Sequence, residues 1–235
     1  GDRRVRLALS SAERTVVKDQ VEAVARTAGR LMLEKVDEAV AQRWDEARRR
    51  AQRSSHQPLD TRLSELADSV AKELAATGAV VGGVAAAPGP GTAAAAATGM
   101  AEFGYFTVRM ADLILTTAAI HGHTEAEVEE RRSWVLAVLL FEDDAAKGYE
   151  QLLEQTARTG DGRSTAIDTA RLVAVNAKMA RKLLARYGAK RGVLRMARLL
   201  PLGIGVVIGG GSNYRAARAT AGHARRFFAE LGGDG

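Results

Sequence analysis

The glycines between Gly203 and Gly211 form the pattern most suggestive of chemistry. Backbone amides without bulky neighbours can cradle phosphate groups at the start of a helix. A P-loop, however, ends in Gly-Lys-Ser/Thr, and this run continues into Ser212 and Asn213 without a lysine. A dinucleotide fingerprint also needs a preceding strand, and no alternating strand pattern occurs here. We therefore interpret the run as a surface for close helix packing or shallow membrane contact.

Two histidines, His121 and His123, stand in a predicted loop at the end of a helix. No third ligand or general-base carboxylate follows at metal-site spacing, and no Gly-x-Ser-x-Gly elbow marks a nucleophilic serine. The absence of cysteine excludes thiolate chemistry and disulfides. The sequence therefore predicts no catalytic residue, no cofactor and no metal ligand. An enzyme would need a site that forms only in three dimensions.

Positive charge is concentrated towards the C-terminus. Thirteen Lys or Arg residues and no Asp or Glu lie between Arg171 and Ala229, in a chain of net charge +6. Two explanations stay open: acidic residues between Glu125 and Glu154 neutralise this region, or it binds an external anionic partner. Under the second explanation, the residues predicted to contact anionic headgroups are Arg191, Arg195, Arg198, Arg215, Arg218 and Arg225.

Two apolar segments carry no charge: 75–101, which contains Pro88-Gly89-Pro90-Gly91, and 199–214. The first is long enough to cross a bilayer, but the Pro-Gly repeat breaks a helix in two, so a helical hairpin is expected instead. Gly78 and Gly82 have the small-xxx-small spacing that allows close helix contact. The residues predicted to contact lipid are Val80, Val81, Val84, Pro88, Ile204, Val206, Val207 and Ile208.

The elements that position these segments are predicted to be helices throughout, so the fold class is an all-α, multi-helix domain. The apolar residues are Ala-rich and only 5% of the chain is aromatic, which favours close helix packing. Residues 1–57 are expected to form a long N-terminal helical segment with a bend at Gly29, and residues 58–232 the main domain. A capping box at Thr124 and Glu127 is expected to start a later helix.

Three charged residues, Glu102, Arg109 and Asp112, interrupt an otherwise apolar predicted helix. An unpaired charge inside a core is costly, so these side chains are expected to pair or to point outward. The spacing of three between Arg109 and Asp112 suits an ion pair within one helix.

The run from Arg195 to Tyr214, RMARLLPLGIGVVIGGGSNY, occurs together with the Gly/Ala hairpin around Pro88 and the segment HGHTEAEVEERRSWVLAVLL. This combination resembles the EcsC family of bacterial proteins over roughly Leu59 to Phe228, most specifically from Leu200 to Asn213. The family takes its name from an ABC-transporter operon. The resemblance implies a helical domain with Gly-rich hairpins and no inherited catalytic residues, and related domains are linked to membranes and lipid handling.

The leading hypothesis is a cytoplasmic protein that binds an anionic membrane surface or lipid peripherally, at the inner face of the membrane. Its basic C-terminal region would attract headgroups and its Gly-rich hairpins would supply apolar contact. The alternative is a protein-binding scaffold or regulatory module in a homo-oligomer or a transporter complex. The positive charge would also suit nucleic-acid binding, but the sequence contains no recognisable nucleic-acid-binding motif. The N-terminus, Gly1 to Leu9, is expected to contain no secretory signal.

Overall fold

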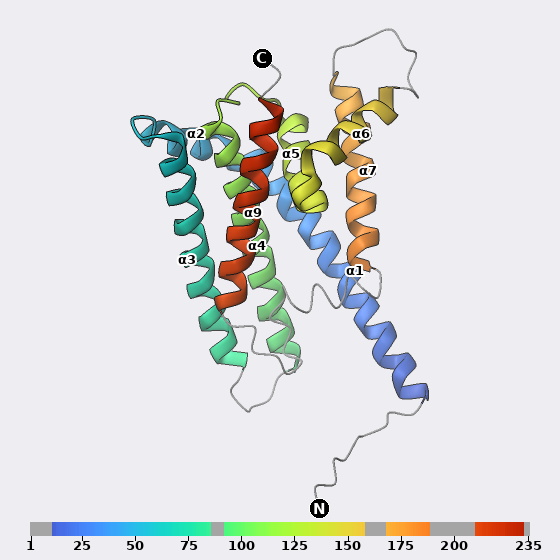
Figure 1. Cartoon of the computed structure of the whole chain (residues 1–235). Helices are drawn as coiled ribbons and strands as arrows, with labels where there is room; N and C mark the ends of the chain where they lie inside the picture. The colour runs from blue at the N-terminus through green and yellow to red at the C-terminus, as the bar shows by residue number, and fades with distance from the viewer. Residues whose placement is uncertain (1–10, 86–91, 158–167, 189–209, 233–235) are drawn as a thin grey trace, which may run out of the picture.

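The computed structural model describes residues 11–85, 92–157, 168–188 and 210–232 (Figure 1). Every regular element in these ranges is helical and none is a strand, which confirms the predicted all-α fold class. The helices share one apolar core, to which the N-terminal helices contribute Ala28, Val36 and Trp44. The boundary expected near residue 57 therefore lies between helices that pack into the same core.

The N-terminal segment forms two helices, α1 (Ser11–Gln42) and α2 (Trp44–Arg53). Helix α1 continues through Gly29, where a bend was predicted, and the helical segment is interrupted at Arg43 instead. A Cβ atom on Gly29 would lie 3.0 Å from Cδ2 of Leu184. Because glycine has no side chain, α1 can pack closely against the helix that carries Leu184. This position therefore depends on the small size of Gly29 and not on its backbone flexibility.

Three long helices form the first layer: α3 (Leu59–Ala85), α4 (Thr92–Ile120) and α9 (Gly210–Leu231). Figure 1 shows α3 running opposite to α4 and α9, with α9 packed against both. Helix α4 stops before Gly122, whose φ of +94° suits a residue without a side chain. Its stretch Gly99–Ile120 is long and apolar enough to cross a membrane, but 83% of the most apolar window is buried. Burial of this kind is typical of a central core helix.

The second layer contains α5 (Val128–Phe141), the short 3-10 helix η1 (Glu142–Asp144), α6 (Ala145–Ala157) and α7 (Thr169–Gly188). The predicted capping box was wrong: Glu127 is itself the N-cap of α5 and its side chain makes no capping bond. At α7 the carboxylate of Asp168 accepts a 2.7 Å hydrogen bond from the Arg171 amide. A side-chain cap of this kind stabilises a helix start.

Aromatic rings join the two layers. Trp134, 1% exposed, packs edge-on against Phe228 with 5.4 Å between ring centroids. Trp44 lies 6.4 Å from Trp134, and Phe227 contacts both Phe228 and Tyr149. Five aromatic residues, contributed by α2, α5, α6 and α9, therefore pack together.

Candidate functional site

Both charge-free segments join the helices at the same end of the molecule. Helix α3 ends at Ala85 and α4 begins at Thr92, while α7 ends at Gly188 and α9 begins at Gly210. In Figure 1 the end of α3 and the starts of α4 and α9 lie towards the lower side, opposite the C-terminus, while α7 ends nearer mid-height on the right. We call this lower region the glycine end. The fold thus brings together, at one end, the attachment points of two apolar segments that are distant in sequence.

The predicted lipid contacts fall in these segments. Val80, Val81 and Val84 belong to the last turns of α3. The remaining predicted contacts lie outside the described residues: Pro88, Ile204, Val206, Val207 and Ile208.

A buried polar cluster lies next to the glycine end. Glu102 of α4 is 6% exposed, and its Oε1 accepts a 3.3 Å hydrogen bond from Nδ2 of Asn213 on α9. The same Nδ2 donates to the Leu74 carbonyl of α3 at 3.3 Å. A Cβ atom on Gly78 would lie only 2.5 Å from this Nδ2. Among the described residues Glu102 therefore has no ion-pair partner, and it does not point outward, contrary to the prediction, because α3 and α9 enclose it.

The predicted headgroup arginines of α9 are all exposed, but they differ in their partners. Arg218 forms an ion pair with Asp68, and Arg225 binds Asp60 at 2.8 Å, near the start of α3. Arg215, close to the glycine end, makes no ion pair with another described residue. Arg191, Arg195 and Arg198 lie outside the described residues. Part of the basic charge is thus balanced within the chain.

Other ion pairs extend this internal balance. Arg226 pairs with Asp143, and Arg186 binds Glu142 at 2.7 Å. These acids belong to the 125–154 stretch that the sequence offered as a neutralising partner. Asp60 and Asp68 of α3 carry no corresponding sequence signal, because only the fold places α3 beside α9.

A second polar network, with Asp112 buried at its centre and Glu73 and Arg50 partly exposed at its edge, lies between α2, α3 and α4. Arg109 pairs with Asp112 as predicted, and it also binds Glu73 through two bonds of 2.6 and 2.8 Å. Arg50 reaches Asp112 at 3.3 Å. Burial alone would raise the pKa of Glu73, but hydrogen bonds from Arg109 and Tyr105 hold it below its usual value. Every charge in this network has a partner, so its role is to join three helices.

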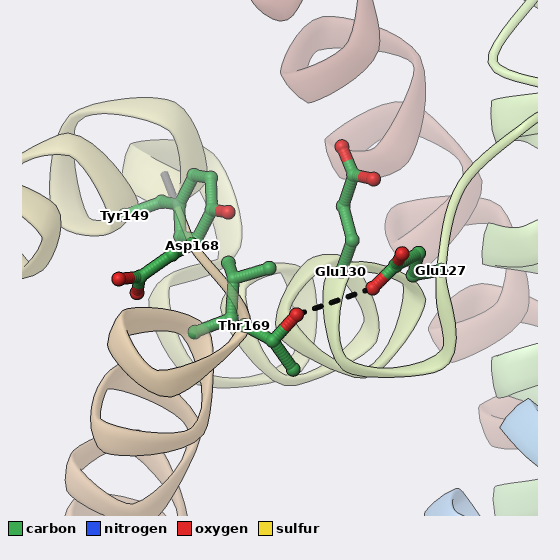
Figure 2. A pocket seen from close by; sticks show the side chains of 6 residues that line it. Glu127, Glu130, Tyr149, Asp168 and Thr169 are labelled. Atoms are coloured by element: carbon green, nitrogen blue, oxygen red, sulfur yellow. Dashed lines mark hydrogen bonds between the residues drawn. The ribbon is translucent and has the colours of Figure 1, made fainter. Parts of the chain in front are cut away.

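An acidic pocket of about 300 Å³ lies at the start of α5 and α7 (Figure 2). Glu127, Glu130, Asp168 and Tyr149 line it, and the Thr169 hydroxyl donates to Glu127 at 3.3 Å. Burial raises the pKa of Glu130. No group of three or more candidate metal ligands occurs among the described residues. Sequence reasoning missed this pocket because only the fold brings Asp168, at the start of α7, beside Glu127 and Glu130 at the start of α5.

The rings of His121 and His123 pack against aromatic residues of the core. The His123 ring lies 5.4 Å from Trp134 and 5.5 Å from Phe228, and His121 lies 6.1 Å from Phe228. Burial lowers the pKa of both imidazoles. Both are therefore favoured in the neutral form and pack as rings in this part of the chain.

Comparison with known proteins decides the family. The sequence profile of the EcsC protein family matches residues 7–230. The chain belongs to the EcsC family. No curated protein and no solved structure matches it.

The EcsC match is wider than the resemblance read from the Gly-rich motifs, which began at Leu59. It includes α1 and α2, in agreement with a core that these helices share with α4, α5 and α7. The N-terminal helices are therefore part of the EcsC unit. The Leu200–Asn213 run, which carries the most specific resemblance to the family, ends at Asn213. The side chain of Asn213 holds α9 against α3 and α4.

Proposed function

We propose that this EcsC protein is a cytoplasmic protein that binds anionic membranes peripherally through its glycine end. The observation that supports the proposal is that the end of α3 and the starts of α4 and α9, which lead into the two charge-free segments, lie on the same side of the molecule. Two apolar segments held at one end can enter a headgroup layer together. Shallow apolar contact of this kind is how peripheral helices bind membranes.

Exposed basic residues near the same end favour an anionic surface. Arg215 lies within the first two turns of α9, and Arg181 and Lys182 are exposed in the half of α7 that leads to Gly188. Each basic residue close to an anionic leaflet contributes about 1 kcal/mol. Several acting together suffice for reversible, salt-sensitive binding.

The alternative proposal is a protein-binding scaffold, and close helix packing at glycines favours it. Gly29 and Gly78 both lie where a side chain would meet a neighbouring helix. The Gly-rich segments could serve the same purpose against a second protein. The two functions differ in whether lipid alone is enough for binding.

Two arginines on α9 provide a matched test of the membrane proposal. Arg215→Glu removes an attraction and adds a repulsion near the membrane, so binding to phosphatidylglycerol vesicles should weaken by about 2 kcal/mol, roughly thirtyfold. Arg225→Glu makes the same change about 15 Å further along the helix, where Arg225 pairs with Asp60. It should weaken vesicle binding much less. Co-sedimentation measures both, and equal losses in the two variants would argue against the glycine end as the contact.

A further inference from the structure

Glu102 is a buried acid that has no cationic partner among the described residues. It is 6% exposed, and its Oε2 atom is buried without a hydrogen-bond partner. Its other oxygen, Oε1, has a single long bond from Asn213. An ionised carboxylate in such surroundings is disfavoured, since no cationic side chain of the described residues pairs with it.

The contact partners of Glu102 belong to three different helices. Asn213 lies in the first turn of α9 and donates to both Glu102 and the Leu74 carbonyl. Gly78 leaves the space that the Asn213 amide occupies, because an added Cβ would lie 2.5 Å from Nδ2 and 3.4 Å from Oε1 of Glu102. The start of α9 is therefore held against α3 and α4 through a contact to a titratable group.

The charged groups on the helices around Glu102 are engaged elsewhere or exposed. On α3, Glu73 pairs with Arg109 of α4. On α1, which packs against α4, Lys35 pairs with Glu38 at 2.6 Å. On α9, Arg215 is exposed. None of these groups contributes to the pKa of Glu102, which burial raises and the Asn213 hydrogen bond lowers.

The sign of the pH effect follows from this balance. Burial dominates, so the pKa of Glu102 lies above its usual value of 4.5 in the folded chain. The folded chain then binds this proton more tightly than the unfolded chain. The stability that the group contributes falls as the pH rises from 4.5 through the raised pKa, and stays constant above it.

We propose that the enclosed Glu102 side chain acts as a proton-controlled latch: the first turns of α9 stay packed against α3 and α4 when Glu102 is neutral, and they loosen when it ionises, because burying the charge costs more than the Asn213 hydrogen bond returns. The latch is a property of the helices themselves and does not depend on the membrane proposal. Its test needs no lipid, so failure of one proposal is distinguishable from failure of the other.

Backbone hydrogen exchange across the first turns of α9 tests the latch, with wild type compared with Glu102→Gln from about pH 4.5 to about pH 8. The intrinsic pH dependence of exchange is the same in both chains and cancels in their ratio. Wild type should exchange at the same rate as the variant at the acidic limit and severalfold faster at the alkaline limit. Glu65→Gln, at an exposed position of α3, should match wild type throughout.

Two results would overturn the latch: a ratio that does not change with pH, or slower exchange in wild type than in Glu102→Gln at alkaline pH. The second result would mean that the carboxylate itself stabilises the contact. If Glu102→Gln does not fold, Glu102→Met supplies an uncharged side chain of similar length. It should likewise remove the pH dependence, and retention of that dependence would assign it to another group.

Discussion

Replacing Asp112 by alanine should lower the free energy of unfolding by about 3–5 kcal/mol, the usual cost of removing one partner from a buried ion pair. The Asp112 side chain is 3% exposed and accepts bonds from Arg109 and Arg50. Without it, two guanidinium groups would face each other between α2 and α4, and Glu73 could compensate only one of them. Denaturant unfolding followed by circular dichroism measures the change.

Asp45→Ala is the matched control for this variant. Asp45 also accepts from an arginine three residues away, Arg48 at 3.0 Å, but its side chain is 69% exposed. Exposed pairs contribute about 0–1 kcal/mol, so this variant should unfold close to wild type. If both variants lost the same free energy of unfolding, burial of Asp112 would not explain the contribution of its ion pairs to stability.

The second large effect concerns membrane binding. Changing Val206 and Val207 together to aspartate should abolish binding to phosphatidylglycerol vesicles, because a charge at apolar depth costs at least about 2.5 kcal/mol per residue. If the membrane proposal holds and these valines are displayed, the melting temperature should stay nearly unchanged, since exposed substitutions usually cost within about 0.5 kcal/mol. Vesicle co-sedimentation and thermal unfolding on the same sample separate the two readouts.

Val128→Asp with Val173→Asp is the control for this pair. Both valines are exposed, at 48% and 47%, and lie on α5 and α7. This control should keep vesicle binding. A Val206/Val207 variant that melted early would place these valines in a protein core, and that outcome would favour the scaffold proposal.

Local pattern was enough to predict the helical class and one ion pair. Apolar residues at helical spacing in α9, such as Ala217, Ala224 and Phe228, are buried. The pair between Arg109 and Asp112 depends only on a spacing of three residues within a helix. Both kinds of prediction need no knowledge of how distant segments meet.

Contacts between helices set the limit of the sequence prediction. Arg50 and Glu73 lie 62 and 36 residues from the side chains they bind, and nothing in their own neighbourhoods marks them. Glu102 appeared as a charge needing a partner, but its enclosure by α3 and α9 depends on Gly78 and Asn213. The shared end of the two Gly-rich segments follows likewise from the helix arrangement.

Glycine was the least predictable residue type. Gly29 suggested a bend, whereas its missing side chain is used for contact with Leu184. Gly122 ended a helix as expected, with a positive φ. The same residue type serves close approach in one place and backbone conformation in another, and only the neighbours distinguish the two uses.

The most direct test of the membrane proposal is co-sedimentation of the wild-type chain with vesicles of phosphatidylglycerol and, separately, of phosphatidylcholine. At low salt the protein should bind the anionic vesicles and remain largely free of the neutral ones. The reason is that exposed basic residues such as Arg215 are attracted to negatively charged headgroups. Raising the salt should release it, since screening weakens attraction between exposed charges. Equal binding to both kinds of vesicle, or no binding to either at low salt, would contradict the proposal.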